Sequence, residues 1–234
     1  MIIKEILKNG VKKLKQNNVE DAFNISRIVL SNILNVNKEY CVIHDEEEVD
    51  NEYIHQFEKD INKIIQGYPL QYITNHQEFM KLDFYVDERV LIPQPDTETL
   101  VEEVIKLCNN YDGKDIKILD LCTGSGAIGI SIKKYVKNSM VTASDISEQA
   151  INVAKMNATN NNVEMKFVKS DLFDKIEGKF DIIVSNPPYI EKNILDELPR
   201  DVKHEPILAL DGGIDGLKYY RKIVQNTHLF LNDS

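Results

Sequence analysis

The tetrapeptide Asn186-Pro187-Pro188-Tyr189 combines groups that could bind a planar nitrogen. It follows an apolar run, residues 182–184, of the kind found in strands buried within parallel sheets. Two prolines end such a strand and restrict its backbone, so the Asn186 amide and the Pro187 carbonyl group are held in place. Each can accept one N–H of an amino or amide group, while the Tyr189 ring packs on its face. We therefore predict that Asn186, Pro187 and Tyr189 are catalytic; the alternative is a turn without chemical function.

A glycine-rich stretch upstream has the spacing of a nucleotide-binding loop. Residues 124–129, Gly-Ser-Gly-Ala-Ile-Gly, match GxGxxG, and Asp145 ends the next predicted strand about 20 residues later. Glycines in such a loop let the backbone approach a ligand, and a carboxylate on the second strand accepts the ribose hydroxyl groups. The motif alone fits any adenosine cofactor, NAD included.

Two further carboxylates favour S-adenosylmethionine as the cofactor. Asp120 precedes the glycines by four residues and could hold the methionyl ammonium group directly or through water, a role with no counterpart at a pyrophosphate. Asp171 follows the third predicted strand, where it could accept from the adenine amino group beside the apolar Leu172 and Phe173. Helix capping and turn formation are the alternatives for both aspartates. A dehydrogenase, however, would leave the tetrapeptide at 186–189 unexplained.

Strands and helices alternate after Asp112-Gly113, which predicts a doubly wound α/β fold with a mostly parallel sheet. Ligands of such sheets bind at the carboxyl ends of the strands, where the glycines and Asp145 fall. An Asn-rich stretch, residues 157–162, is predicted to be a loop. The predicted strands span residues 116–121, 140–144, 163–168 and 181–184, and the predicted helices span 127–136 and 148–158.

The residues before this sheet divide into two segments of different periodicity. Residues 1–69 carry apolar side chains at spacings of three and four, which predicts a small helical bundle that binds a substrate or partner. Residues 70–92 follow period two, which predicts a β-hairpin linker to a catalytic domain at 93–234. The prolines in residues 91–98 stiffen this junction, which forms either a plain domain joint or one wall of the active site.

Composition limits the classes of binding partner and the cellular location that we expect. Lys and Arg number 28 against 38 Asp and Glu, and the formal net charge of −10 is unfavourable for binding duplex phosphates, although a local basic patch remains open. The three cysteines are widely spaced and the five histidines form no metal-binding pattern, so we expect neither disulfides nor a metal site. No apolar run approaches the ~18 residues of a membrane span and no signal peptide is evident, so we expect a cytoplasmic protein.

Together, these motifs resemble those of class I methyltransferases, and Asn-Pro-Pro-Tyr resembles the signature of enzymes that methylate planar nitrogen. More closely, the chain resembles the HemK/PrmC family of protein-glutamine methyltransferases, which modify the glutamine of the Gly-Gly-Gln tripeptide in class 1 peptide chain release factors. The resemblance implies a Rossmann-like methyltransferase sheet, S-adenosylmethionine as methyl donor and release factors as partners. It covers nearly the whole chain and includes residues 67–73, 91–98, 120–126, 185–189, 205–213, 215–217 and 220–221.

The resemblance also assigns site residues. It implies that Asn186, Pro187, Pro188 and Tyr189 grip the substrate glutamine, and that Asn186 contacts the cofactor as well. With the residues inferred above, the predicted cofactor-binding set is Asp120, Cys122, Thr123, Gly124, Ser125, Gly126, Asp145, Asp171, Leu172 and Asn186.

Four features depart from the family pattern. Gln94 stands where the family usually has Arg, which weakens any anion site in this wall. Cys122 and Asn75 replace glycines: Asn tolerates a positive φ, whereas Cys122 is expected to keep φ below zero, with a packed and non-nucleophilic side chain. Family members also continue past residues 229–231 into further strands, so we expect a truncated sheet with C-terminal strands missing and an unpaired edge exposed.

Three functions are compatible with these residues. The first is methyl transfer to the glutamine amide nitrogen, a poor nucleophile that the site must hold in line with the sulfonium methyl group. The second is an adenine-directed nucleic-acid methyltransferase that uses the same tetrapeptide on a flipped base and has a basic groove. The third is a cofactor-binding module that docks on release factors without turnover.

Overall fold

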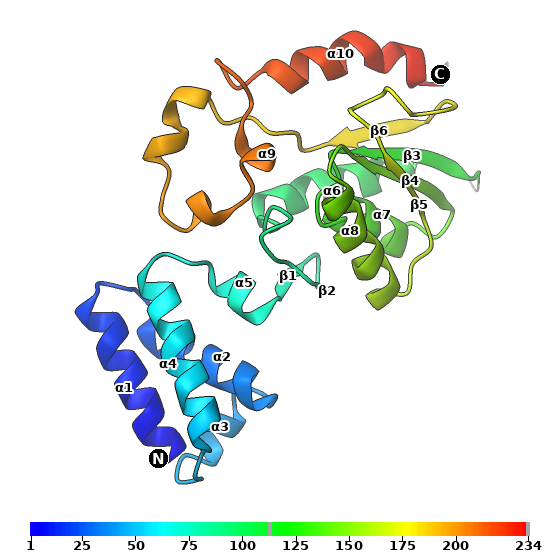
Figure 1. Cartoon of the computed structure of the whole chain (residues 1–234). Coiled ribbons are helices and arrows are strands. Elements are labelled where there is room, and N and C mark those ends of the chain that lie inside the picture. Colours follow the sequence, from blue (N-terminus) through cyan, green and yellow to red (C-terminus); the bar gives the residue numbers. More distant parts are fainter. Residues whose placement is uncertain (112–113, 233–234) are drawn as a thin grey trace. The chain divides into compact units, whose positions relative to one another are not determined.

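The computed structural model describes residues 1–111 and 114–232, so the expected domain start at Asp112-Gly113 lies outside the described residues. The chain forms two compact units (Figure 1). The helical unit comprises Met1–Asn75 together with Pro199–His204. The sheet unit comprises His76–Leu198 and Glu205–Ser234. The second unit contains the glycine-rich loop and the tetrapeptide.

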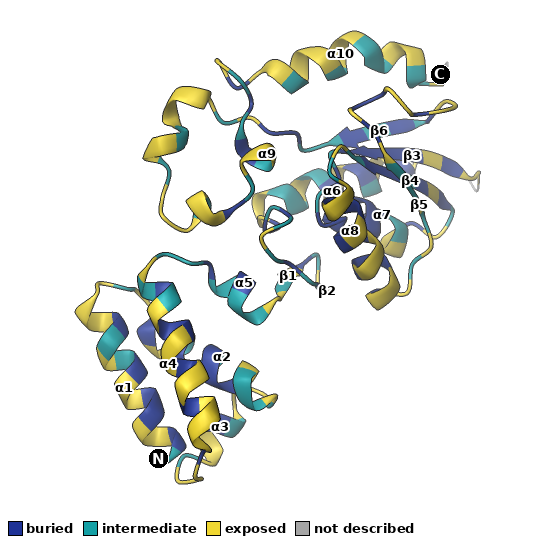
Figure 2. Cartoon of the chain, viewed as in Figure 1, coloured by how far each residue is buried: buried dark blue, intermediate teal, exposed yellow. Residues whose placement is uncertain are grey.

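The helical unit is built on amphipathic helices with one buried stripe each (Figure 2). Its core contains Ile3, Leu14, Leu30 and Ile61. Gly10 lets α1 approach α4, because a Cβ at this position would lie 2.6 Å from Cζ of Phe57. The helices are α1 (Ile3–Gln16), α2 (Ala22–Leu34), α3 (Tyr40–Ile43), α4 (Asn51–Ile65) and α5 (Leu70–Thr74).

The sheet unit contains a parallel sheet with the strand order β5-β4-β3-β6, which confirms the predicted α/β fold. The strands are β3 (Ile116–Leu121), β4 (Ser139–Asp145), β5 (Lys166–Lys169) and β6 (Ile182–Ser185). In the register, Asp120 of β3 lies between Ala143 of β4 and Val184 of β6. β5 begins three residues later than the predicted strand at 163–168.

Helices cover both faces of this sheet (Figure 1). On one face, α6 (Asp96–Cys108), α7 (Ala127–Tyr135) and α8 (Glu148–Asn160) form a core with Ile116 and Ile118. On the other face, α10 (Lys218–Phe230) packs its Tyr219, Ile223 and Phe230 against a core that includes Leu119 and Leu121. Alternate residues of β3 therefore serve two different cores, as expected for a central strand.

A hairpin precedes the sheet. β1 (Gln77–Phe79) pairs with β2 (Leu82–Phe84), and both residues of the Met80-Lys81 turn have positive φ, as a type I′ turn requires. Phe79 and Phe84 are buried and pack edge to face, 6.1 Å apart. Within the predicted linker at 70–92, the hairpin is thus preceded by helix α5 and followed by irregular chain.

The loop predicted for the Asn-rich stretch at 157–162 is wrong for residues 157–160, which are helical, and only the last two residues form a turn. Helix α8 continues through Asn160, and Asn157 and Asn161 are buried. Local composition favours a loop, but here tertiary hydrogen bonds satisfy the amide groups, which is the usual way a helix overrides weak propensity.

Between β6 and α10 lie two short 3₁₀ helices (Lys192–Glu197, Val202–His204) and α9 (Ile207–Leu210). After α10, Leu231 forms a parallel bridge with Phe180, just before β6. Among the described residues, β6 itself pairs with β3 alone, so its other side is an edge. No helix in the described part of the chain is long and apolar enough to cross a membrane.

Candidate active site

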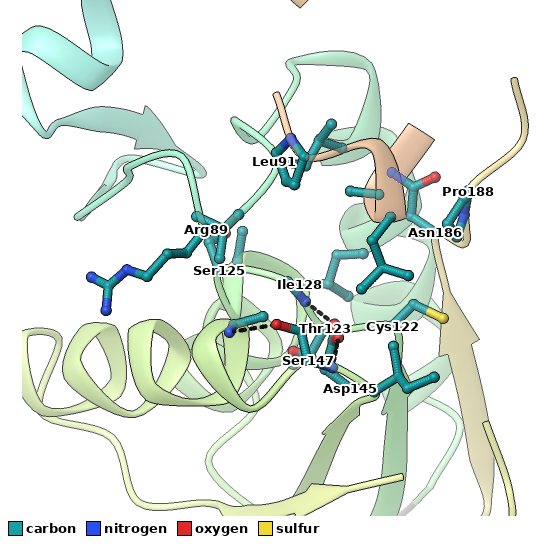
Figure 3. A pocket seen from close by; sticks show the side chains of 18 of the residues that line it. Arg89, Leu91, Cys122, Thr123, Ser125, Ile128, Asp145, Ser147, Asn186 and Pro188 are labelled. Atoms are coloured by element: carbon teal, nitrogen blue, oxygen red, sulfur yellow. Dashed lines mark hydrogen bonds between the residues drawn. The ribbon is translucent and has the colours of Figure 1, made fainter. Parts of the chain in front are cut away.

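A cavity of about 370 Å³ opens at the carboxyl ends of the parallel strands (Figure 3). This is where ligands bind in open α/β sheets. The loops after β3, β4, β5 and β6 contribute one side of the lining, with residues 122–125, 144–147, 170–172 and Asn186 with Pro188. Two other segments complete the wall, residues 88–94 and 206–209. Thr97 of α6 and Tyr219 of α10 also line it.

The glycine loop is fixed by backbone hydrogen bonds. The N–H of Thr123 donates to the Ser144 carbonyl (2.9 Å), and the N–H of Gly126 donates to the Thr123 carbonyl (2.8 Å). Gly126 has φ +85°, and a Cβ there would lie 2.7 Å from Cδ1 of Ile130. A Cβ on Gly124 would instead meet nothing within 4 Å, so the space above this residue is open to a ligand. Gly126 is buried under the loop and does not line the cavity.

Asp145 ends β4 and lines the cavity, as the sequence predicts for a ribose-binding acid. Its Oδ2 accepts from the N–H of Gly124 (2.9 Å) and its Oδ1 from the N–H of Ser147 (2.9 Å). Burial raises the pKa of the Asp145 carboxyl, while these backbone N–H groups lower it. Each carboxylate oxygen has a second lone pair, so the group can also accept from ligand hydroxyls.

Asp120 lies beneath the loop and does not line the cavity. The side chain is fully buried, and its Oδ2 accepts from the Thr123 hydroxyl (2.6 Å) and from the N–H of Gly129 (3.0 Å). Its Oδ1 has no hydrogen-bond partner among the described residues. Burial is the main reason that the pKa of Asp120 rises to about 7. In this structure, Asp120 therefore supports Thr123 and the start of α7.

Cys122 contradicts the expectation of a negative φ. Its φ is +60°, so the residue adopts the left-handed conformation of the glycine that it replaces. The neighbouring backbone holds it there, because Thr123 bonds to β4 and the Ser185 hydroxyl donates to the Leu121 carbonyl (2.8 Å). Burial and nearby carboxylates raise the pKa of the Cys122 thiol to about 12. The thiol is thus protonated at neutral pH, which agrees with a non-nucleophilic side chain.

Asp171 and Leu172 follow β5 and line the cavity. Asp171 is exposed, whereas Leu172 is buried and has φ +46°. Phe173 points into the core, where its ring stacks on Phe230 at 4.6 Å. Ile146 also lines the cavity and is 46% exposed, so it offers a second apolar surface next to Asp145.

The tetrapeptide reaches the cavity through Asn186 and Pro188. The Asn186 amide nitrogen donates to the Thr97 hydroxyl at 3.4 Å, which orients the planar amide. In Figure 3, Asn186 and Leu91 lie on the opposite side of the cavity from Asp145. Pro187 is buried outside the lining, and Tyr189 is 57% exposed beside it.

Residues about 20 positions after the tetrapeptide form hydrogen bonds with the chain that directly follows it. The N–H of Ile190 donates to the Leu210 carbonyl (2.9 Å), and the N–H of Gly212 donates to the Ile190 carbonyl (2.8 Å). A Cβ on Gly212 would lie 2.7 Å from the Tyr189 Cα, so only glycine allows this approach. A Cβ on Gly216 would lie closer still, against the Tyr189 carbonyl oxygen.

The wall at 88–94 overlaps the segment 91–98, which the sequence left as either a joint or an active-site wall, and residues 91, 93, 94 and 97 of that segment line the cavity. Arg89 contributes its stem, while its guanidinium group turns away and pairs with Asp87 (2.6 Å; Figure 3). The N–H of Ile92 donates to the buried Glu205 carboxylate (2.8 Å). Gln94 is exposed, and its amide donates to the Ile92 carbonyl (3.1 Å).

Several lining residues were not found from the sequence. Thr97 belongs to the segment 91–98 that was predicted as a possible wall, but it was not singled out there. The wall at 206–209 comes from a segment noted only for its resemblance to the family, and Ile146 carries no signal beyond its place next to Asp145. No group of three or more His, Cys, Asp or Glu side chains in the described ranges could hold a metal ion.

The parallel sheet, the glycine loop and the Asn-Pro-Pro-Tyr corner at one cavity define a methyltransferase. Residues 96–201 match the family model of the methyltransferase small domain, and residues 5–74 match that of the PrmC N-terminal domain. The crystal structure of the hMettl16 catalytic domain is similar in fold, with a TM-score of 0.54 at 18% identity over 68% of this chain and 61% of that one.

Curated relatives narrow the class further. A release factor glutamine methyltransferase of Clostridium acetobutylicum is 46% identical over 95% of this chain and 80% of its own length. That of Moorella thermoacetica is 39% identical over 94% of this chain and 78% of its own length. The chain belongs to the release factor glutamine methyltransferase family.

Proposed function

We propose that this enzyme transfers a methyl group from S-adenosylmethionine to the side-chain amide nitrogen of the glutamine in the Gly-Gly-Gln motif of class 1 peptide chain release factors. The observation that carries the proposal is the orientation of Asn186. Because its amide nitrogen faces Thr97, its oxygen is the atom that can accept an N–H from the substrate. This acceptor stands at the mouth of an adenosine-type cavity, as transfer to a planar amide requires.

The cavity residues fit the cofactor. The open space above Gly124 lets ligand atoms approach the backbone, and the Asp145 carboxylate receives the two ribose hydroxyls. Leu172 and Ile146 offer apolar faces to the adenine ring, and Asp171 accepts from its amino group. Cys122, Thr123, Ser125 and Gly126 shape the loop over the methionyl part, with Asp120 supporting it from below. The bound cofactor supplies an electrophilic methyl group on a sulfonium sulfur.

The chemistry depends on positioning. A glutamine amide nitrogen is a weak nucleophile because its lone pair is delocalised into the carbonyl group. The Asn186 oxygen accepts one N–H group, and the carbonyl group of Pro187, a residue that adjoins the cavity lining through Asn186 and Pro188, accepts the other. These two bonds orient the nitrogen and stabilise the positive charge that develops on it. Pro188 and the Tyr189 ring pack against the amide plane. With S-adenosylmethionine bound, a C–N bond would replace the C–S bond of the methyl group, and the nitrogen would release one proton to solvent.

We assign docking of the release factor to the helical domain at residues 1–69. A hairpin linker at 70–92 connects it to the catalytic domain at 93–234. Three exposed apolar side chains on the helical unit support this role: Phe23, Ile43 and Tyr53 are 50%, 74% and 42% exposed. The reaction takes place in the cytoplasm and involves no metal, no membrane and no direct nucleic-acid substrate.

The test uses methyl-labelled S-adenosylmethionine with a release factor, the same factor with the Gly-Gly-Gln glutamine changed to alanine, and a DNA duplex. Label on the unaltered factor alone is expected. Label on DNA would instead identify an adenine-directed enzyme, and cofactor binding without any label would identify a non-catalytic module.

The role of Asn186 has its own test. Asn186→Ala should lower turnover about 100-fold or more, because one preorganised hydrogen-bonding group at the reacting atoms is lost. Its affinity for S-adenosylhomocysteine should fall only modestly. Asn226→Ala is the matched control, since this amide bonds the Lys222 carbonyl within α10. Normal turnover by Asn186→Ala would contradict the proposed role.

A further inference from the structure

Asn157 is a residue of α8 that lies outside the cavity lining. Its side chain is fully buried, and both its N–H donors and its oxygen bond to two distant backbone segments. Its Oδ1 accepts from the N–H of Tyr85 (2.7 Å), and its Nδ2 donates to the Tyr85 carbonyl (3.0 Å) and to the Ser125 carbonyl (2.9 Å). One amide therefore connects the chain after the hairpin to the glycine loop.

Both connected segments lead directly into the cavity. Ser125 belongs to the glycine loop and lines the cofactor side (Figure 3). The chain after Tyr85 becomes the wall at 88–94, and α6 then places Thr97 against the Asn186 amide. A shift of Tyr85 would therefore move the wall on the substrate side, and a shift of Ser125 would move the loop on the cofactor side.

Only an amide suits this place. It offers one acceptor to the Tyr85 N–H and two donors to two carbonyl groups. An aspartate would turn a carboxylate oxygen towards both carbonyl oxygens, and an apolar side chain would remove the partner of the buried Ser125 carbonyl and of two partly buried groups of Tyr85. A side chain that only packed α8 against its neighbours would not require two donors and one acceptor.

We propose that Asn157 is a positioning residue that holds the cofactor loop and the substrate-side wall in register, so that one buried side chain sets the geometry of both halves of the active site. The part of this inference that concerns the release factor rests on the proposed function. The part that concerns the two backbone segments does not.

The chain offers a matched control one helical turn later. Asn161 is also buried, and its Nδ2 donates to the Asp83 carbonyl (2.9 Å) and to the Asn157 carbonyl (3.0 Å). Asn157→Asp and Asn161→Asp therefore remove the same pair of N–H to carbonyl bonds from neighbouring buried sites. Only the first pair includes the glycine loop.

The first measurement is amide hydrogen exchange, followed by mass spectrometry, in the absence of any ligand. In Asn157→Asp, the peptides that cover residues 85–97 and 122–126 should both exchange faster than in the unaltered protein. In Asn161→Asp, the faster exchange should be confined to the hairpin. Equal patterns in the two variants would overturn the proposal.

The second measurement is the dissociation constant for S-adenosylhomocysteine, with the KM for a release factor beside it. Asn157→Asp should weaken both about tenfold, as expected for the loss of two buried hydrogen bonds, while Asn161→Asp should leave both close to their original values at a similar loss of stability. Adding an osmolyte until the melting temperature is restored should not restore the affinity. Recovery with stability would show that the role is structural only, and would overturn the proposal.

If Asn157→Asp does not fold, Asn157→Ser and Asn161→Ser form a second, neutral pair with the same expected contrast. If the unaltered protein binds S-adenosylhomocysteine but methylates no release factor, the proposed function fails, while the exchange and binding measurements still decide the role of Asn157.

Discussion

The buried carboxyl group of Asp120 makes a quantitative prediction about stability and pH. Its pKa is about 7 in the folded protein, against an ordinary value of 3.8, chiefly because the group is fully buried. The folded state therefore holds a proton that the unfolded state has already released. Between these two values, each rise of one pH unit lowers the free energy of unfolding by about 1.4 kcal/mol. From pH 5 to pH 8, Asp120 should thus remove about 2–3 kcal/mol of stability.

Asp120→Asn isolates this effect. The amide oxygen can still accept from the Thr123 hydroxyl and the Gly129 N–H, and the amide nitrogen takes the place of the oxygen that has no partner. That buried N–H group costs about 1–3 kcal/mol, but at every pH. The variant should therefore lose much of the difference in stability between pH 5 and pH 8. Asp145, whose pKa is also raised by burial, keeps a smaller dependence of the same sign.

The assay is urea unfolding at pH 5 and pH 8, with the free energy of unfolding compared between the two proteins. Asp215→Asn serves as the contrast. Arg221 lowers the pKa of Asp215 to about 2 on an exposed surface, so this group titrates below pH 5 and its loss should leave the difference unchanged. An Asp120→Asn protein that loses stability from pH 5 to pH 8 as steeply as the unaltered one would refute the assignment of this dependence to Asp120.

Three further substitutions test the geometry of the loop and of the tetrapeptide. Cys122→Gly removes a side chain from the left-handed region, which should relieve about 1–2 kcal/mol of backbone strain. This relief exceeds the ~0.5–1 kcal/mol entropic cost of glycine, so urea unfolding should show equal or higher stability. A clear loss of stability would show that the Cys122 backbone is not strained. Gly216→Ala places a side chain at a positive φ, where its Cβ overlaps the Tyr189 carbonyl group. The free energy of unfolding should fall by more than about 1 kcal/mol, and the melting temperature and turnover should both fall. Thr97→Val removes the acceptor for the Asn186 amide and should lower kcat about three- to tenfold with unchanged S-adenosylhomocysteine affinity; unchanged kcat would show that Thr97 does not orient Asn186.

The sheet and the cofactor loop could be predicted because their signals are local. β3 has the predicted bounds, and Gly124 and Asp145 meet through a hydrogen bond as a nucleotide-binding loop and its acid should. These features follow from apolar runs, glycines and strand ends, which short stretches of sequence encode.

The errors arose where distant residues decide the local structure. The positive φ of Cys122 depends on the backbone bonds of its neighbours to other strands, and nothing in a cysteine signals it. The first part of the Asn-rich stretch continues helix α8 to Asn160, and the amides of Asn157 and Asn161 donate to carbonyl groups of the glycine loop and the hairpin. The burial of Asp120 likewise depends on the packing of α7 over β3, which spacing alone does not reveal.

The hydrogen bonds that fix the chain after Tyr189 also affect the order in which the parts of the site are completed during synthesis. Strands β3 to β6 and the glycine loop have been made once residue 186 has been added, and a chain emerging from the ribosome can begin to fold from its N-terminal part. The tetrapeptide gains its backing only when Leu210 and Gly212 bond to Ile190. The glycine loop is therefore synthesised before the residues that fix the chain just after the tetrapeptide.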